Sequence, residues 1–277
     1  MTSYIYNQNM LWINTHRRGL MDYEQFKEQV LALTKINLHM YKEKQMKRRI
    51  DSLIAKNKID GYKAYIEAIK KDTKLFEEFV NYLTINVSEF WRNPDQWKVL
   101  EEFVVPELIS KFGKNLKIWS AACSTGDEPY SLVMLLSKFM PLSNIKILAT
   151  DIDKQVLEKA RVGLYNEKSL VGLPEEFKKK YFTPVGKTNY QISEEIKRCV
   201  EFKEGNLLAD KYPSGLDLIV CRNVVIYFTD EAKSEIYKKF NQSLKSGAYL
   251  FVGSTEQIIN YKDLNYSSFK SFFYKKN

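Results

Sequence analysis

Two adjacent carboxylates, Asp127 and Glu128, follow a short turn after the apolar run KIWSAA and stand at the start of a predicted helix. An apolar strand, a turn of small residues and a helix are typical of the phosphate site in nucleotide-binding α/β proteins. Such a turn needs several glycines, and this one has only Gly126. Because the two carboxylates lie where the phosphate would bind, they disfavour NAD, FAD and ATP as ligands.

The two carboxylates can also have a purely structural role, because acidic residues at a helix N-terminus stabilise the helix by roughly 0.5–2 kcal/mol. A third carboxylate, Asp151, ends the next apolar run, IKILATD. At this edge of a parallel sheet an acidic side chain can accept hydrogen bonds from both hydroxyls of a ribose. A ligand with a ribose, a positive charge and no phosphate fits both positions, and S-adenosylmethionine has these features. We expect Asp127 to cap the helix and Glu128 to contact the ligand.

A later apolar run, DLIVCRN, ends in Arg222 and Asn223 and is followed by VVIYF, which contains Tyr227. Polar side chains at the carboxyl ends of strands build the ligand sites of α/β proteins. Taken singly, Arg222 and Asn223 could be solvated loop residues, and Tyr227 could be a core residue. Together with the other two strand ends, they favour one ligand site at one edge of the sheet.

The elements that position these residues follow from the spacing of apolar residues. From about Leu116 onward, apolar runs alternate with helical segments, which predicts a mostly parallel sheet covered on both faces. Helical spacing without proline from about residue 22 to 83 predicts an all-helical domain. The stretch YFTPVGKTNYQI predicts a small antiparallel insertion at about 167–200. We therefore predict a disordered extension at 1–20, a helical domain at 21–95 and an α/β domain at 96–277.

Composition narrows the class of protein. The chain has 277 residues, of which 44% are hydrophobic, so it should fold around a core. It lacks both an apolar run of about 18 residues and a secretory signal, so we expect a cytoplasmic protein without direct membrane insertion. Three cysteines without a CxxC pair, and two histidines distant from these motifs, indicate neither a disulfide nor a metal site.

Positive charge is concentrated in residues 34–63, where nine lysines and arginines against three acidic residues account for six of the nine net positive charges. An apolar helical stripe leaves Lys44, Lys47 and Arg48 mostly on the other faces, while Arg49 flanks it. Such a run is usually only a solvated helix face. The net charge of +9 favours an acidic partner, but it does not choose among nucleic acid, anionic lipid and protein.

Six separated motifs occur in the order that characterises one family: TINVSEFWR, SAACSTGDEPYS, ATDID, NLL, CRNVVIYF and LFVGSTE. From about residue 22 to 277 the chain resembles the CheR-type chemotaxis receptor methyltransferases. The resemblance implies a class I S-adenosylmethionine-dependent methyltransferase with a Rossmann-like, mostly parallel sheet, an all-helical N-terminal domain and a small antiparallel β insertion. It also implies a protein-glutamate O-methyltransferase, which converts glutamate side chains of methyl-accepting chemotaxis receptors into methyl esters.

The resemblance also implies the residues of the site. By similarity, the cofactor site would be lined by Asn86, Ser88, Arg92, Glu128, Asp151, Asn206, Leu207, Arg222 and Asn223. Arg92 and Tyr227 would lie nearest the transferred methyl group, and no metal is expected. The basic helix would dock on the acidic methylation helices in the cytoplasmic region of the receptor, through Lys44, Lys47, Arg48 and Arg49. The chain departs mildly from the family pattern at Ser88, Trp91 and Asp127.

The expected acceptor decides which catalytic groups the protein needs. A glutamate side chain has a reference pKa of about 4.3 and is an anion at neutral pH, so it can attack the methyl group without a general base. Catalysis then depends on the alignment of donor and acceptor and on the exclusion of water. We therefore assign Arg92 and Tyr227 to positioning and not to proton transfer.

Two other functions would share the cofactor domain. A nucleic-acid methyltransferase would explain the positive charge, but base N-methylases often carry an Asp/Asn-Pro-Pro-aromatic motif where this chain has CRNVVIYF. A non-catalytic S-adenosylmethionine-binding receptor scaffold is the second alternative, and the intact Arg92 and Tyr227 argue against it. We expect a monomer without a nucleic-acid partner. The sequence leaves open which receptor glutamates are modified and whether the insertion binds a receptor tail peptide.

Overall fold

The computed structural model describes residues 21–277, and the extension predicted at residues 1–20 lies outside them. The described chain forms two compact units, residues 21–83 and 84–277. The segment 84–95, which the sequence analysis assigns to the helical domain, is part of the second unit. Within residues 21–277, no helix combines the length and the apolar character needed to span a membrane.

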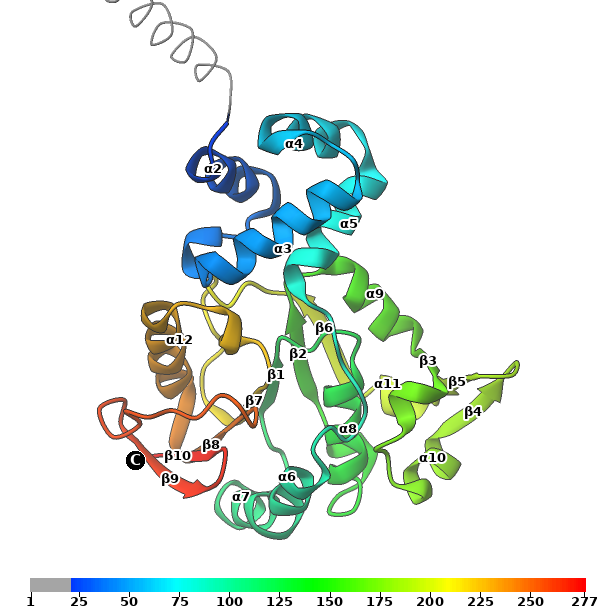
Figure 1. The fold of residues 1–277 in the computed structure, drawn as a ribbon. Helices are drawn as coiled ribbons and strands as arrows, with labels where there is room; N and C mark the ends of the chain where they lie inside the picture. Colours follow the sequence, from blue (N-terminus) through cyan, green and yellow to red (C-terminus); the bar gives the residue numbers. More distant parts are fainter. Residues whose placement is uncertain (1–20) are drawn as a thin grey trace, which may run out of the picture. The chain divides into compact units, whose positions relative to one another are not determined.

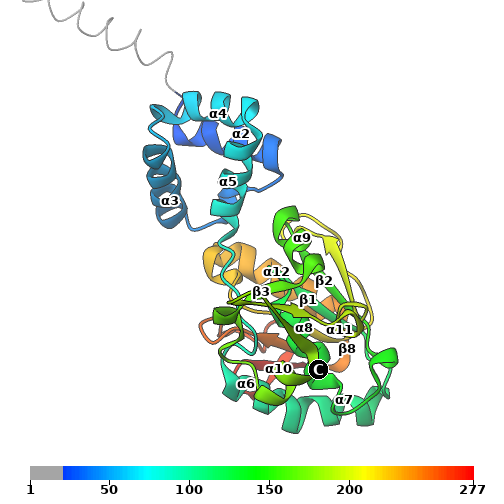
Figure 2. The same cartoon turned by 90° about the vertical axis from the view of Figure 1, so that its right-hand side faces the viewer.

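The first unit is helical. Its elements are α2 (Tyr23–Thr34), η1 (Leu38–Met40), α3 (Glu43–Lys56), α4 (Gly61–Lys71) and α5 (Thr73–Thr84). Figure 2 shows the four α-helices arranged around a common centre. Phe26, Ile50, Tyr65 and Phe79 come from different helices and are fully buried. This core is what the helical spacing of the apolar residues predicts.

The second unit is built on a sheet in the order β6-β2-β1-β7-β8-β10-β9 (Figure 1). The strands are β1 (Ile118–Ala121), β2 (Ile147–Asp151), β6 (Val200–Glu204), β7 (Leu216–Cys221), β8 (Leu244–Val252), β9 (Tyr266–Lys270) and β10 (Phe273–Lys276). Strands β6, β2, β1, β7 and β8 are parallel, and β10 and β9 add an antiparallel edge. The central strands β1 and β7 are buried along their whole length, as expected when helices cover both faces.

Helices connect these strands and cover the sheet. They are α6 (Pro94–Val99), η2 (Leu100–Val104), α7 (Val105–Phe112), α8 (Asp127–Leu136), η3 (Leu142–Asn144), α9 (Lys154–Val162), η4 (Glu167–Leu170), α10 (Glu175–Tyr181), α11 (Glu194–Lys197), η5 (Val225–Tyr227) and α12 (Asp230–Ser243). The hydroxyl of Ser120 in β1 donates to Glu128 of α8 at 2.8 Å. The ring of Trp119, the preceding residue, lies 5.5 Å from the Phe240 ring of α12. Because neighbouring side chains of a strand point to opposite faces, α8 and α12 cover opposite faces of the sheet.

A small antiparallel sheet, in the order β3-β5-β4, interrupts the alternation of strands and helices. Its strands are β3 (Leu164–Asn166), β4 (Phe182–Val185) and β5 (Asn189–Ile192), and they extend from one side of the α/β unit (Figure 1). Gly186, between β4 and β5, has a φ of 65°, a left-handed conformation that glycine adopts without strain. The predicted fold class, a mostly parallel sheet with an all-helical N-terminal domain and a small antiparallel insertion, is confirmed.

Candidate active site

The turn between β1 and α8 runs close to its neighbours, as a ligand-binding turn must. Gly126 precedes α8 and has a φ of 88°. A Cβ atom at this position would lie 2.9 Å from the Cβ of Ala160 and 3.1 Å from the ring of Tyr130. Both the backbone conformation and the available space therefore require glycine here.

Asp127 is the first residue of α8, and Gly126 occupies the N-cap position without a side-chain cap. The Asp127 carboxylate instead accepts a hydrogen bond from the Thr125 hydroxyl at 2.5 Å. Burial raises the pKa of Asp127, while hydrogen bonds from the hydroxyls of Thr125 and Ser88 oppose the rise. The expectation that Asp127 caps the helix is wrong, because the cap position belongs to a glycine that has no side chain.

The Glu128 side chain lies between β1 and the end of β7 and is only 13% exposed. Its Oε1 accepts a hydrogen bond from the Ser120 hydroxyl at 2.8 Å, and its Oε2 lies 3.7 Å from Nη1 of Arg222. Burial raises the pKa of Glu128, and the positive charge of Arg222 opposes this rise. The structure thus places a carboxylate, balanced by a buried cation, at the carboxyl edge of the sheet.

Arg222, immediately after β7, ties the segment 92–96 to the sheet. Its Nη2 lies 2.7 Å from the carbonyl oxygen of Arg92, 3.0 Å from Oδ1 of Asn93 and 2.9 Å from Oε1 of Gln96. Burial lowers the pKa of Arg222, and the charge of Glu128 opposes this. Arg222, predicted as a cofactor contact, therefore also links Glu128 to the backbone of Arg92.

Asp151 ends β2, as the sequence predicts, and both of its oxygens accept backbone hydrogen bonds. Oδ2 accepts from the amide of Ser124 at 2.8 Å, and Oδ1 accepts from the amide of Asp153 at 3.0 Å. Burial raises the pKa of Asp151 to about 6. The turn after β1 and the end of β2 are thus joined through this carboxylate.

Asp153 is a residue that the sequence analysis did not single out. Its Oδ1 caps α9 by accepting from the amide of Gln155, and its Oδ2 accepts from the Asn86 side chain at 2.8 Å and the Thr84 hydroxyl at 3.0 Å. The predicted cofactor residue Asn86 is therefore held by Asp153, which follows Asp151 by two residues. The available signal was the second acid of ATDID, which stands before a helix where Asp is a preferred N-cap.

Asn206 and Leu207 follow β6 and line a cavity of about 330 Å³. Other residues that line it include Trp119, Thr150, Gly205 and Tyr212. The Asn206 side chain accepts a hydrogen bond from the amide of Leu208 at 2.9 Å, and the carbonyl of Leu207 accepts one from the Tyr212 hydroxyl at 2.6 Å. The loop after β6 is thus closed on itself around a partly aromatic cavity, of a size typical for small-molecule sites.

Arg92 and Tyr227 come from different segments of the second unit. The Arg92 side chain is 33% exposed, and its Nη1 donates to the carbonyl of Val87 at 3.3 Å. The positive charge of Arg92 lowers the pKa values of Glu128 and Arg222. Tyr227 is the last residue of η5 and is partly exposed. The Arg222 guanidinium joins the backbone carbonyl of Arg92 to Glu128, whereas Tyr227 follows Arg222 by five residues and lies at the end of η5.

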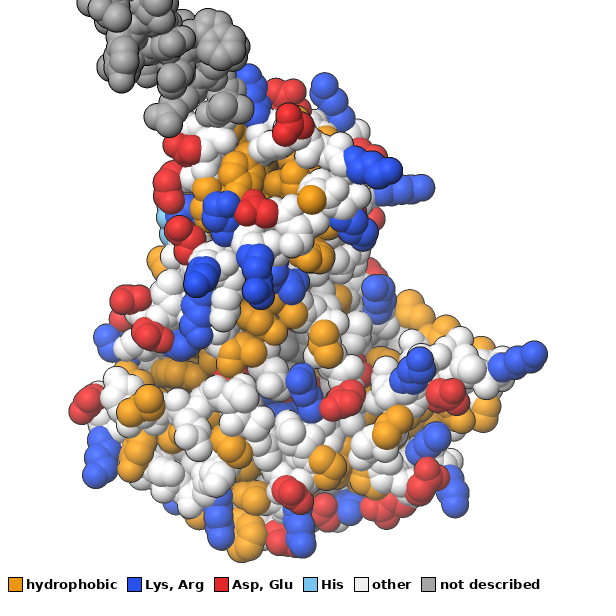
Figure 3. Space-filling view, in the orientation of Figure 1, with side chains coloured by type: hydrophobic (Ala, Val, Ile, Leu, Met, Phe, Trp, Pro, Cys, Tyr) orange, Lys and Arg blue, Asp and Glu red, His pale blue; other side chains and the backbone are white. Residues whose placement is uncertain are grey.

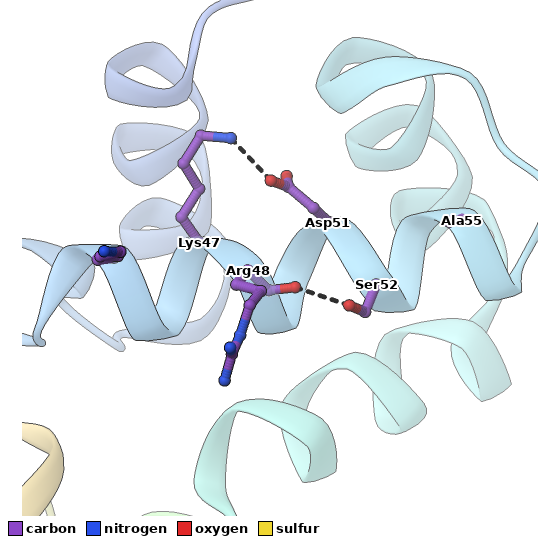
Figure 4. Close-up of a pocket in the computed structure, with 6 residues that line it drawn as sticks. Lys47, Arg48, Asp51, Ser52 and Ala55 are labelled. Carbon is purple, nitrogen blue, oxygen red and sulfur yellow. Dashed lines mark hydrogen bonds and ion pairs between the residues drawn. The ribbon is translucent and has the colours of Figure 1, made fainter.

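The predicted basic surface lies on α3 in the first unit. Figure 3 shows lysine and arginine side chains gathered over this helix. Lys44, Lys47, Arg48, Asp51, Ser52 and Ala55 line a shallow hollow of about 530 Å³. Figure 4 shows Lys47 directed toward Asp51, while Arg48 extends away from it. Lys44 and Arg48 are exposed, and neither forms an ion pair within the described part of the chain.

The other two predicted docking residues, Lys47 and Arg49, form contacts within the helical unit. Lys47 Nζ lies 2.7 Å from Oδ2 of Asp51, whose other oxygen accepts from the Tyr62 hydroxyl at 2.6 Å. The hydrogen bond to Asp51 raises the pKa of Lys47. Arg49 donates to the carbonyl of Tyr82 at 2.6 Å and lies 4.6 Å from its ring. Arg49, predicted as a substrate contact, is therefore partly exposed and bonded to the end of α5.

Both units match known families. Residues 86–272 match the SAM-binding domain of CheR methyltransferases, and residues 21–84 match their all-alpha domain. A chemotaxis protein methyltransferase of Listeria innocua is 42% identical over 92% of this chain and 97% of its own length. Others from Borreliella burgdorferi and Pseudomonas putida are 35% and 33% identical, each over 87% of this chain and over 89% and 91% of their own lengths. The chain therefore belongs to the CheR methyltransferase family and is an S-adenosylmethionine-dependent methyltransferase.

Proposed function

We propose that this enzyme transfers a methyl group to glutamate side chains of methyl-accepting chemotaxis receptors, which forms glutamate methyl esters in chemotactic adaptation. Family membership gives the reaction class. The observation that carries the proposal is the pair of carboxylates, Glu128 and Asp151, at the carboxyl edge of the sheet. Such an edge repels a phosphate and attracts a cationic ligand that carries a ribose.

The residues at this edge fit S-adenosylmethionine. The Asp151 carboxylate accepts backbone hydrogen bonds at both oxygens, and a carboxylate has about four lone-pair sites, so its remaining acceptor capacity suits the ribose hydroxyls. Glu128 supplies a buried negative charge, and the cavity beside Asn206 and Leu207 suits a planar base. Asn86, Ser88, Arg92, Arg222 and Asn223 complete the proposed binding set. When bound, the cofactor would supply a methyl group on a positively charged sulfur.

The chain's own contribution to transfer is alignment. The incoming glutamate is already an anion, so neither Arg92 nor Tyr227 needs to remove a proton. Arg92 is one third exposed and can hold the incoming carboxylate, and the phenol of Tyr227 can donate a hydrogen bond to it. A tight clamp on this anion would stabilise the ground state and slow transfer, so the exposed setting of Arg92 suits a positioning role.

The exposed cations of α3 are the proposed docking site for the receptor. The enzyme is proposed to act as a monomer. Lys44 and Arg48 are exposed, and Lys47 borders the same hollow. A surface of this charge complements the acidic methylation helices in the cytoplasmic region of the receptor and would raise the association rate. Arg49 flanks this surface and is bonded to the carbonyl of Tyr82.

The deciding experiment incubates the enzyme with methyl-labelled S-adenosylmethionine and either receptor cytoplasmic fragments or RNA. We expect label on the receptor fragment that is released by mild base, as a glutamyl ester requires. Label on RNA would instead support a nucleic-acid methyltransferase, and cofactor binding without transfer would support a non-catalytic receptor scaffold. Either of these results overturns the proposal.

A further inference from the structure

One buried carboxylate in the second unit is surrounded by backbone amides. Glu256 follows β8, and the whole residue is 4% exposed. Its two oxygens accept hydrogen bonds from the amides of Asn223 (2.5 Å), Val224 (2.8 Å), Val225 (2.8 Å), Ile226 (3.4 Å) and Gly253 (2.9 Å). Within residues 21–277, no lysine or arginine forms an ion pair with it. The carboxylate is thus balanced by amide dipoles.

The amides belong to the two strand ends that border the candidate site. Residues 223–226 are consecutive and fill the interval between Arg222 and Tyr227. Asn223 has a φ of 60°, a left-handed conformation that needs support from its surroundings. Converging amides of this kind favour an anion, and only a group that accepts at both oxygens satisfies all of them. Glu256 therefore fixes the backbone that leads into Tyr227.

Gly253 shows how closely the two strand ends approach. A Cβ atom at this position would overlap Oε2 of Glu256 and would lie 2.9 Å from the amide nitrogen of Asn223. The atoms it would meet include backbone, which cannot move aside as a flexible side chain can. Substitution of Gly253 is therefore a second way to perturb this contact, because it displaces the Glu256 carboxylate without removing it.

We propose that Glu256 is a positioning residue for methyl transfer, whose carboxylate holds the backbone of residues 223–226 so that Asn223 and Tyr227 keep one arrangement at the site. The proposal rests on the function proposed above. A glutamine of the same size would point an N–H group at backbone N–H donors and leave them unpaired. Loss of the anion therefore disturbs the loop even where the packing volume is unchanged.

The test compares Glu256→Gln and Gly253→Ala with Glu107→Gln in the full chain. Glu107 belongs to the same unit and accepts hydrogen bonds from Tyr249 and Lys275, but it is not assigned to the site. We expect kcat for receptor methylation to fall by at least about tenfold in the first two variants, with the KM for receptor within about twofold of wild type. Glu107→Gln should lower the melting temperature and keep kcat.

A double variant separates positioning from general stability. If Glu256 acts through Tyr227, Tyr227→Phe should lower kcat much less in the Glu256→Gln background than in the wild type. Additive effects, or a loss of kcat no larger than that of Glu107→Gln, would overturn the proposal. Should Glu256→Gln fail to fold, Glu256→Asp, which keeps the charge, and Gly253→Ala carry the same comparison.

Hydrogen exchange keeps this proposal independent of the proposed substrate. Glu256→Gln should accelerate exchange at the amides of residues 223–226, and Glu107→Gln should not. If wild-type enzyme fails to methylate receptor while the exchange result holds, the proposed function is wrong and the role of Glu256 in ordering the loop stands. Unchanged exchange at these amides rejects the role of Glu256 whatever the substrate.

Discussion

Arg222 and Arg48 use the same side chain in opposite ways. The Arg222 side chain is 3% exposed, lies beside Glu128 and is within hydrogen-bonding distance of three oxygens of the segment 92–96. Arg48 is exposed on α3 and forms no ion pair within the described residues. Breaking a buried pair leaves a stranded charge, whereas an exposed charge contributes little to folding. The buried arginine organises its own unit, and the exposed one is available to a partner.

Removing the buried cation should have the largest effect. Arg222→Met leaves the Glu128 carboxylate without its counter-ion and removes a donor from three acceptors in the segment 92–96, of which, within the described residues, only the Arg92 carbonyl keeps another donor, the Trp97 indole. We expect a loss of about 3–5 kcal/mol in the free energy of unfolding and no detectable methyl transfer. Urea denaturation and a transfer assay measure these effects. The matched control is Arg198→Met, at an exposed arginine of the same unit, and equal stability of the two variants would contradict the comparison.

Substitution of the two proposed positioning residues should reduce turnover and leave the fold intact. Arg92→Ala and Tyr227→Phe remove partly exposed groups, so the free energy of unfolding should change little. We expect kcat to fall about tenfold to a hundredfold, because the acceptor is no longer held in line with the methyl group. Single-turnover kinetics give this value, with Lys98→Ala as an exposed control on α6. Wild-type turnover in both variants would contradict the assignment of Arg92 and Tyr227 as positioning residues.

Asp151 should make cofactor affinity depend on pH. Burial raises its pKa from 3.8 to about 6, so the ligand-free fold holds a proton that the unfolded chain has lost between those values. Its contribution to stability is therefore largest at low pH and is lost as the pH rises through about 6. Ribose hydroxyls donate to the ionised form, so S-adenosylmethionine affinity should rise with pH, by up to about tenfold per unit below 6. Calorimetric titration should show a flatter profile for Asp151→Asn, and an unchanged slope would reject the assignment.

The sequence was sufficient to predict features that depend on local order along the chain. The alternation of apolar runs and helices predicted the parallel sheet, and Asp151 and Arg222 were correctly placed at the ends of β2 and β7. Membership in the CheR family indicates the same fold, and this evidence does not depend on the spacing of apolar residues. These features follow from periodicity, because the period of apolar residues decides which face of an element is buried.

The roles of particular side chains depended on partners far away in the sequence. Asp127 was expected to cap α8, but the backbone conformation of Gly126 gives the cap position to the glycine. Arg49 is predicted on the receptor surface, and its bond to the carbonyl of Tyr82 is not visible in the sequence. Asp153 holds Asn86 across 67 residues of sequence. Single-sequence periodicity indicates which face a residue occupies, but it cannot identify a hydrogen-bond partner brought close by the tertiary fold.

The exposed cations should affect docking and leave the chemistry unchanged. Arg48→Glu reverses a charge on the proposed receptor surface, so we expect the KM for receptor to rise several-fold, with kcat and the free energy of unfolding nearly unchanged. The effect should shrink at high salt, because screening weakens exposed charges. Steady-state kinetics at two ionic strengths measure it. Lys63→Glu, an exposed substitution of the same charge on α4, is the control, and an equal effect there would show that only net charge matters.

The smallest expected effect concerns Lys47. Its side chain is paired with an acid, as that of Arg222 is, but it lies at the surface, as that of Arg48 does. Asp51 holds it at 2.7 Å and also accepts from the Tyr62 hydroxyl, so an internal acid competes with the acidic receptor for this cation. Asp51→Asn should free Lys47 and lower the KM for receptor by about twofold, since an exposed pair is worth about 0.2–1 kcal/mol. Asp60→Asn makes the same change of charge at the start of α4, where the Asp60 side chain forms no cap. The gain should vanish in a Lys47→Ala background; if it persists there, or if Asp60→Asn reproduces it, the gain comes from net charge and Lys47 is not a docking residue.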